Sequence, residues 1–293
     1  MMAVNISNPA ETMNILKKYG FTLKKSLGQN FLIEPNILTK IVEKAEIDLN
    51  TGVIEIGPGI GALTQKIAEK AGKVVAIEID QRLIPILKET LSPYDHIKLI
   101  HADVLKTNLN QLIIEELKEY SSKKIVANLP YYVTTPILIK LLEDRLGIDS
   151  ITVMVQKEVA ERINAKPGGK EYGSLTLLIE YYAQASIAFY VPSSVFIPKP
   201  NVDSAILHLK MRKEPPIKVK DEDFLFKLIR ASFSQRRKTL FNNLIHNLFG
   251  KERKAEVEEI LNSVGIDPVR RAETLTLSEF AKLSDEIYFR EIY

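Results

Sequence analysis

The stretch GVIEIGPGIGALT, residues 52–64, decides the fold. A short run of β-branched and apolar residues leads into a turn that holds Gly57, Gly59 and Gly61, and a helical pattern follows. Glycines let the backbone approach a ligand closely, and the first turn of a helix presents unpaired amide groups. Tight packing of a strand on a helix also requires small residues, so the glycines alone leave both interpretations open.

The same rhythm of β-branched runs and helical patterns continues along the chain. The further runs are KVVAIEI (73–79), IKLIHA (97–102), KKIVANL (123–129) and SITVMVQ (150–156). Such alternation is typical of βαβ units in a parallel sheet, because buried parallel strands are apolar on both faces. We therefore expect an α/β fold with a Rossmann-like, mostly parallel sheet and right-handed crossovers.

The pattern changes after residue 156. A helix is expected near residues 174–182, and the strand-like runs 185–191 and 204–211 have no room for a helix between them. They should pair antiparallel at one edge of the sheet. KEPPIKV (213–219) reads as a linker, and helical periodicity follows it. We expect a catalytic domain over residues 1–212 and a small all-α domain over 213–293.

Composition limits the class of protein. The 293 residues are 45% hydrophobic and 26% charged, which is an ordinary globular balance, and no run approaches 18 apolar residues. The start of the chain lacks the pattern of an export signal. Cysteine is absent and the four histidines are scattered, which excludes disulfides and disfavours a metal site. We expect a monomeric cytoplasmic protein without membrane or metal.

Charge is distributed unevenly although the net charge is only +3. Residues 224–250 contain no acidic residue but hold five basic ones, namely Lys227, Arg230, Arg236, Arg237 and Lys238. This segment predicts a local positive field that attracts a polyanion. Further lysines and arginines that extend such a surface are Lys24, Lys25, Lys157, Arg162 and Lys170, although charged runs are usually solvated faces.

Two carboxylates accompany the glycine turn. Glu78 ends the second strand, at the spacing where a carboxylate accepts hydrogen bonds from both hydroxyls of a ribose; the alternative is a strand end in solvent. The glycine spacing is G-x-G-x-G, which differs from the dinucleotide fingerprint. Glu55 would repel a pyrophosphate but can orient the amino group of an amino-acid tail. These features favour S-adenosylmethionine over a dinucleotide.

Further candidate cofactor contacts lie at the next strand tip and near the start of the chain. Asp103 follows the third strand, where it can accept from the exocyclic amine of an adenine or cap a helix. In SLGQNFL (26–32), Gln29, Asn30 and the backbone at Leu32 are placed to close over the amino-acid end of a cofactor.

NLPYYVTTP (128–136) follows the fourth strand and supplies candidate catalytic groups. The side-chain oxygen of Asn128 and the main-chain oxygen of Leu129 can each accept one N–H of an adenine amine, which aims the nitrogen lone pair at a methyl donor. Pro130 stiffens the turn, and Tyr131 offers a ring for stacking. The alternative is an ordinary turn with a structural tyrosine.

Two more aromatic residues stand near these groups in the sequence. Phe196, in VFIPKPNVDSA (195–205), is placed to cover the opposite face of a flipped-out base; its alternative is burial under the loop. Tyr132 is expected to pack against the protein.

Seven stretches together resemble the ribosomal RNA small-subunit adenine dimethyltransferases, in the expected order over nearly the whole chain. They are SLGQNFL, EIGPGIGALT, AIEID, HADVL, NLPYYVTTPIL, VFIPKPNVDSA and FSQRRKTLFNNL. The resemblance implies a class I S-adenosylmethionine-dependent methyltransferase domain followed by a small helical domain. By position in that family, the cofactor contacts would be Asn30, Leu32, Gly57, Glu78, Asp103 and Asn128.

The resemblance also implies a substrate and a partner. The family dimethylates N6 of two adjacent adenosines in a hairpin loop near the 3′ end of 16S rRNA, on an assembly intermediate of the small subunit. Tyr132 stands where asparagine is common in the family. FSQRRKTLFNNL (233–244) is interpreted as a basic helix start that binds RNA phosphates through Arg236, Arg237 and Lys238, with Arg230 nearby.

Three functions remain open from the sequence. The first is the small-subunit enzyme just described. The second is methylation of a different adenine, either in large-subunit (23S) RNA, as in the related macrolide-resistance enzymes, or in DNA. The third is a non-catalytic assembly or transcription factor that retains the fold, which the acceptors at Asn128 and Glu78 disfavour.

Overall fold

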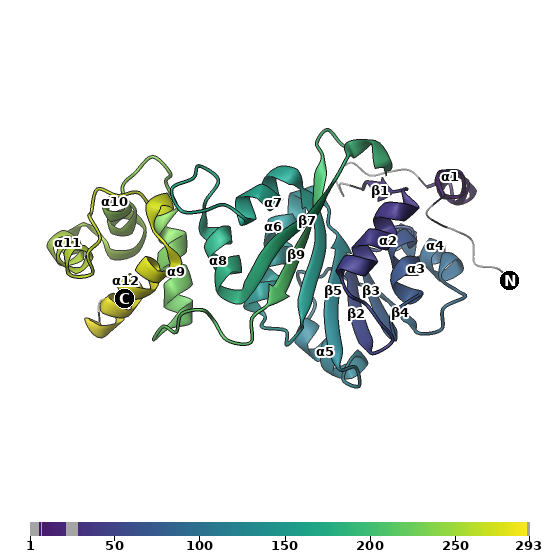
Figure 1. Ribbon diagram of the computed structural model, residues 1–293, viewed down its shortest axis with the longest axis horizontal. Helices are drawn as coiled ribbons and strands as arrows, with labels where there is room; N and C mark the ends of the chain where they lie inside the picture. Colours follow the sequence, from purple (N-terminus) through teal and green to yellow (C-terminus); the bar gives the residue numbers. More distant parts are fainter. Residues whose placement is uncertain (1–5, 7, 22–28, 292–293) are drawn as a thin grey trace. The chain divides into compact units, whose positions relative to one another are not determined.

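A computed structural model describes residues 6, 8–21 and 29–291 of the chain. Its central sheet has seven strands in the order β4-β3-β2-β5-β6-β9-β7 (Figure 1). The strands are β2 (Thr51–Ile56), β3 (Lys73–Glu78), β4 (Ile97–His101), β5 (Ser122–Asn128), β6 (Ser150–Gln156), β7 (Ala183–Val191) and β9 (Ser204–Met211). The expected runs of β-branched residues therefore form these strands.

The first five strands of this order pair in parallel, from β4 through β3, β2 and β5 to β6. Strand β9 pairs antiparallel with β6, from Ser150 opposite Lys210 to Gln156 opposite Ser204. This confirms a Rossmann-like, mostly parallel sheet. The antiparallel strand is internal, because β9 returns between β6 and β7 and leaves β7 at the edge.

Helices precede, connect and follow the parallel strands. Their bounds are α2 (Pro35–Lys44), α3 (Ala62–Ala68), α4 (Ile84–Thr90), α5 (Leu109–Glu116), α6 (Thr134–Glu143) and α7 (Lys157–Ile163). Side chains of α2, α3 and α4 form one hydrophobic cluster with alternate strand residues such as Val53, Val74 and Val126. Since side chains alternate along a strand, these three helices cover one face of the sheet.

A two-residue ribbon joins segments far apart in the sequence. Strand β1 (Phe31–Leu32) pairs antiparallel with β8 (Phe196–Ile197). Sequence patterns did not predict it, because two residues carry no periodicity. The preceding N-terminal helix, α1 (Pro9–Lys18), begins with an Asn8 side chain that accepts a hydrogen bond from the Ala10 amide.

The chain forms two compact units. One comprises the residues up to Ala160 together with Ala185–Met211, and the other comprises Glu161–Gln184 and the residues from Arg212 onward. The last change of unit falls between Met211 and Arg212, one residue before the boundary expected from the linker. Residues 161–184, which the sequence analysis placed in the first domain, group with the second unit.

The second unit is helical. It contains α8 (Ser174–Tyr182), α9 (Glu222–Ser232), α10 (Leu240–Leu244), α11 (Lys254–Ser263) and α12 (Leu277–Phe289). The Tyr181 and Tyr182 rings of α8 lie 5.3 Å and 5.5 Å from the Phe226 ring of α9. This aromatic packing explains why α8 belongs with the C-terminal helices.

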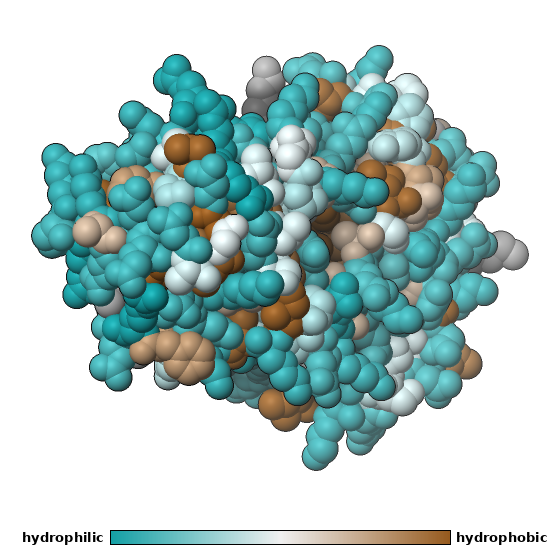
Figure 2. Space-filling model, turned by 60° about the vertical axis from the view of Figure 1, so that its left-hand side comes forward, coloured by the Kyte–Doolittle hydropathy of each residue, from teal (hydrophilic) through white to brown (hydrophobic). Residues whose placement is uncertain are grey.

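The surface seen in Figure 2 is mostly hydrophilic, with hydrophobic side chains in separate small groups. Within the described part of the chain, every helix is too short or too polar to cross a membrane.

Candidate active site

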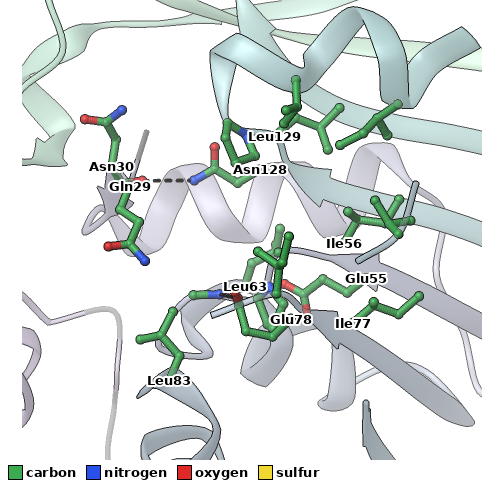
Figure 3. Close-up of a pocket in the computed structure, with 18 of the residues that line it drawn as sticks. Gln29, Asn30, Glu55, Ile56, Leu63, Ile77, Glu78, Leu83, Asn128 and Leu129 are labelled. Carbon is green, nitrogen blue, oxygen red and sulfur yellow. Dashed lines mark hydrogen bonds between the residues drawn. The ribbon is translucent and has the colours of Figure 1, made fainter. Parts of the chain in front are cut away.

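A pocket opens at the carboxyl ends of the parallel strands, where open α/β sheets bind ligands (Figure 3). The tips of β2, β3, β4 and β5 contribute residues that the sequence analysis singled out, and so does the segment before α2. Those that line it are Gln29, Asn30, Leu32, Glu55, Gly57, Gly59, Glu78, Asp103, Asn128, Leu129, Pro130 and Tyr131. The structure therefore brings most of the candidate residues to one place.

The glycine turn between β2 and α3 uses a backbone that other residues rarely adopt. Gly57, Gly59 and Gly61 have φ values of 69°, 62° and 95°. A Cβ atom at Gly59 would also lie 3.1 Å from the ring of Phe31. Glycine is therefore required here, both for the left-handed backbone and for the close approach of β1.

Glu78 closes onto this turn from the end of β3. Its Oε2 accepts from the amide of Gly59 at 3.2 Å, and its Oε1 accepts from the amide of Asp80 at 2.8 Å. Only 4% of the residue is exposed, and this burial raises the pKa of Glu78 to about 7. The carboxyl group is thus fixed by the backbone at the pocket wall, where it can meet the hydroxyls of a ligand.

Glu55 lies on β2, immediately before the turn. It is 1% exposed, and burial raises the pKa of its carboxyl to about 8, with a further contribution from the negative charge of Glu78. Among the described residues nothing donates a hydrogen bond to its Oε2 atom. The hydroxyl of Thr64 on α3 interacts with this carboxyl and lowers its pKa, and a cationic ligand in the pocket would favour its ionised form in the same way.

Asn128 ends β5 and faces the pocket. Its Nδ2 donates to the main-chain oxygen of Asn30 at 3.2 Å, which Figure 3 marks by a dashed line. This bond uses the donor end of the amide and leaves Oδ1 as the acceptor end. Leu129 and Pro130 follow, and Pro130 holds an extended backbone with φ −60° and ψ 131°.

The two tyrosines after Pro130 have different environments. The Tyr131 hydroxyl is hydrogen-bonded to Oγ of Ser204 at 2.7 Å, and burial raises its pKa. The ring is thereby held at the pocket wall. Tyr132 also lines the pocket but is 56% exposed, so the expectation that it packs against the protein is wrong.

Asp103 lies at the tip of β4. Its Oδ1 accepts from the amide of Leu105 at 3.0 Å, which forms a local turn. The following helix, α5, is capped by a different residue, since Asn108 accepts from the amide of Gln111. Asp103 therefore does not cap a helix; it lines the pocket, and its role as acceptor for an adenine amine stays a prediction.

Phe196 is placed differently from the expected stacking position. It is 3% exposed, pairs with β1 and belongs to the hydrophobic cluster under α2 and α3. Within the described chain it is absent from the pocket lining. Its environment corresponds to burial under the loop, and a role against a base stays a prediction.

A network around Asp80 was not anticipated. Asp80 is 5% exposed, and its carboxylate accepts from Nε2 of Gln29 at 2.8 Å and from Nε and Nη2 of Arg82 at 2.9 Å and 2.6 Å. The Arg82 guanidinium lies 4.6 Å from the ring centre of Phe21. Arg82 is two residues after Asp80, but Gln29 lies 51 positions before Asp80, and no short motif reveals that contact.

The basic segment of the second unit forms a turn. Arg236, Arg237 and Lys238 lie between α9 and α10 with exposed side chains, so the interpretation as the start of a helix is wrong. Arg230 is exposed on α9. The buried Asn243 side chain holds the turn, since it donates to the carbonyl of Gln235 and accepts from its amide, both at 3.1 Å.

Lys24 and Lys25, with the first three residues of SLGQNFL, lie outside the described residues. In the described ranges, His, Asp and Glu side chains form no cluster of three or more that could hold a metal ion.

The sheet order, the glycine turn after β2 and the carboxylate at the tip of β3 define the Rossmann-like methyltransferase class. Within that class, the model of one family, described as ribosomal RNA adenine dimethylase, matches residues 20–283. The chain belongs to this family of rRNA adenine dimethyltransferases.

Similar proteins agree with this assignment. Proteins named Ribosomal RNA small subunit methyltransferase A from Anoxybacillus flavithermus and Listeria monocytogenes are 57% and 59% identical, and the alignments cover 98% and 97% of each chain. The crystal structure of a dimethyladenosine transferase from Plasmodium falciparum has a TM-score of 0.73 at 28% identity, over 89% of this chain and 98% of that one. The 23S rRNA methyltransferase ErmE has a TM-score of 0.64 at 25% identity, over 88% and 99%.

Proposed function

We propose that this protein dimethylates N6 of two adjacent adenosines in the 3′-terminal hairpin loop of 16S rRNA, with S-adenosylmethionine as methyl donor. The observation that carries the proposal is the Asn128 amide, whose donor end is occupied by Asn30 so that its acceptor end serves the pocket. The small-subunit name of the relatives at 57–59% identity supports the choice of RNA. The cytoplasm and a small-subunit assembly intermediate are the setting that this substrate requires.

The pocket has the chemistry that S-adenosylmethionine needs. The unsatisfied Oε2 of Glu55 matches a ligand with a cationic amine, and the fixed carboxyl of Glu78 matches a ribose. Asp103 supplies an acceptor for an adenine amine, while Gln29, Asn30 and Leu32 also line the pocket. When bound, the cofactor supplies a methyl group made electrophilic by a sulfonium.

The substrate side of the pocket suits a planar base with an exocyclic amine. Oδ1 of Asn128 and the carbonyl of Leu129 each accept one N–H, which directs the nitrogen lone pair away from both oxygens. The same acceptors favour the positive charge that develops on nitrogen during transfer. The ring of Tyr131, held by Ser204, offers a face for the base.

RNA backbone binding is assigned to the basic turn and its neighbour. Arg236, Arg237 and Lys238 are exposed on a turn that Asn243 braces, and Arg230 is exposed on α9. Each cation that neutralises a phosphate displaces condensed counterions, so binding should weaken as salt increases.

The decisive experiment offers the purified protein both ribosomal subunits from cells that lack this methylation, together with labelled S-adenosylmethionine. Mapping by mass spectrometry should find two adjacent N6,N6-dimethyladenosines in 16S rRNA and none in 23S rRNA. The similarity to ErmE makes 23S rRNA the second candidate, and label confined to the large subunit would establish it instead. Absence of label on both subunits, with cofactor bound, would support a non-catalytic role.

A further inference from the structure

An exposed aromatic and a lysine form a pair on the first unit. The Lys157 ammonium lies 5.2 Å from the ring centre of Tyr190. Tyr190 is 51% exposed and Lys157 is also exposed, so a large flat ring and a positive charge face solvent together. Tyr190 keeps about half of its residue surface accessible with the lysine in place, which allows a further planar group to reach the side chain.

Short contacts connect this pair to the substrate side of the pocket. Lys157 follows Gln156, the last residue of β6, and its amide donates to the carbonyl of Asp203 at 3.0 Å. The next residue, Ser204, is hydrogen-bonded to the hydroxyl of Tyr131. Lys157 therefore lies on the same edge of the sheet as Asn128, one strand further along, and Tyr190 near the end of β7 reaches it from two strands beyond β6.

The chemistry of the pair matches a nucleotide. A tyrosine face stacks on any base, and an ammonium beside it meets the phosphate of the same residue. An adenosine that enters the pocket from a single-stranded loop has neighbours on both sides, and at least one of them must run over the rim. Exposed aromatics with adjacent cations are the usual means of holding such a strand.

We propose that Tyr190 and Lys157 bind a nucleotide next to the target adenosine in the same RNA strand, Tyr190 through its base and Lys157 through its phosphate. This inference rests on the proposed function and adds a substrate contact outside the pocket. It assigns to β7 and the start of α7 a role in positioning the loop for methylation.

A matched pair elsewhere in the chain provides a control. The Lys220 ammonium lies 5.5 Å from the ring of Phe289 on α12, and Phe289 is 65% exposed. This pair has the same chemistry but belongs to the second unit, and neither of its residues lines the pocket. Phe289→Ala should therefore leave methylation of undermethylated small subunits at the wild-type rate.

Steady-state methylation of undermethylated small subunits tests the proposal. Tyr190→Ala should raise KM for the subunit about ten-fold, with kcat and cofactor affinity within about two-fold of wild type. Tyr190→Phe keeps the ring and should behave as wild type. Lys157→Ala should reduce the slope of log affinity against log salt by about one. A wild-type KM for the subunit in Tyr190→Ala would overturn the proposal. So would a loss of cofactor affinity as large as the rise in KM for the subunit.

Crosslinking identifies what lies on the ring. A photoreactive p-benzoylphenylalanine at position 190 should crosslink to 16S rRNA beside the methylated adenosines. A crosslink to a ribosomal protein instead would overturn the assignment to RNA. If the wild-type enzyme labels neither subunit, the proposed function fails; if it labels the small subunit and position 190 proves silent, only this inference fails.

Discussion

The side-chain nitrogen of Asn128 donates a hydrogen bond to the main-chain oxygen of Asn30 at 3.2 Å, across 98 residues of sequence. The Asn128 amide thereby joins the segment that contains Asn30, before α2, to the tip of β5. The bond also decides the orientation of the amide, because a carbonyl can only accept. Oδ1 must then be the atom offered to a substrate amine.

The first prediction concerns this amide. Asn128→Ala should lower kcat by about 10²–10³, since it removes a preorganised acceptor for developing charge, while the protein still binds cofactor. Asn128→Asp keeps an oxygen at the site but places it against the Asn30 carbonyl without a donor, so turnover should also fall. Single-turnover methylation of small subunits measures both. Wild-type turnover in Asn128→Ala would remove the proposed role of this residue.

The second prediction concerns stability. The pKa of Glu55 is about 8 in the folded chain against a usual 4.5, so folding retains a proton that the unfolded chain loses. The free energy of unfolding should therefore fall as pH rises from about 4.5 to 8, by up to about 1.4 kcal/mol per pH unit for this group. Above pH 8 this contribution should be constant.

Urea denaturation between pH 5 and 9 checks this expectation. Glu55→Gln should reduce the slope and stabilise the protein at pH 8, whereas Glu158→Gln, an exposed change of the same charge, should keep it. Equal slopes for wild type and Glu55→Gln would show that Glu55 carries no retained proton.

The third prediction concerns cofactor affinity. A cationic ligand attracts ionised carboxylates, so its binding must remove protons held by Glu55 and Glu78, whose pKa values are about 8 and 7. Affinity for S-adenosylmethionine should rise from pH 6 to pH 8, by at most about ten-fold per pH unit for each proton released. Calorimetry in two buffers with different ionisation enthalpies measures the released protons directly. A pH-independent affinity without proton release contradicts this electrostatic account.

The sequence predicted the sheet because its signal is local. Each strand from β2 to β6 is a β-branched run between helical patterns, and each run corresponds to a strand in the structure. The site followed from topology, since the carboxyl ends of parallel strands share one edge. The positions of Glu55, Glu78 and Asn128 at one edge of the sheet could therefore be predicted from the sequence alone.

Features that depend on tertiary contacts were missed. Pairing of β1 with β8 joins Phe31 to Ile197 and Leu32 to Phe196, which are 166 and 164 residues apart, and leaves no pattern in either segment. The same pairing buries Phe196, which the sequence placed over a base. Helix α8 was predicted correctly, but its aromatic packing on α9 could not be.

The fourth prediction concerns the Asp80 network. Arg82 orients the Asp80 carboxylate, which in turn holds Gln29 at the pocket. Arg82→Ala should weaken cofactor binding about five-fold, because it removes the ion-paired hydrogen bonds that orient Asp80 toward Gln29. The kcat at saturating cofactor should stay near the wild-type value. Lys140→Ala removes a salt bridge of 2.6 Å from α6 to its C-cap residue Asp144 and serves as control. An unchanged cofactor affinity in Arg82→Ala would limit this network to a structural role.

The fifth prediction separates charge from shape in the basic turn. Arg236→Gln and Arg237→Gln should each lower the slope of log affinity against log salt by about 0.7–0.9, because each removes one phosphate contact. Asn243→Ala keeps every charge but removes both hydrogen bonds to Gln235. Its affinity for the small subunit should therefore fall while the salt slope stays near wild type, since the same cations are present on a less ordered turn. Filter binding at several salt concentrations distinguishes the two effects. A reduced salt slope in Asn243→Ala would contradict this expectation and show that the hydrogen bonds of Asn243 decide which cations contact phosphate.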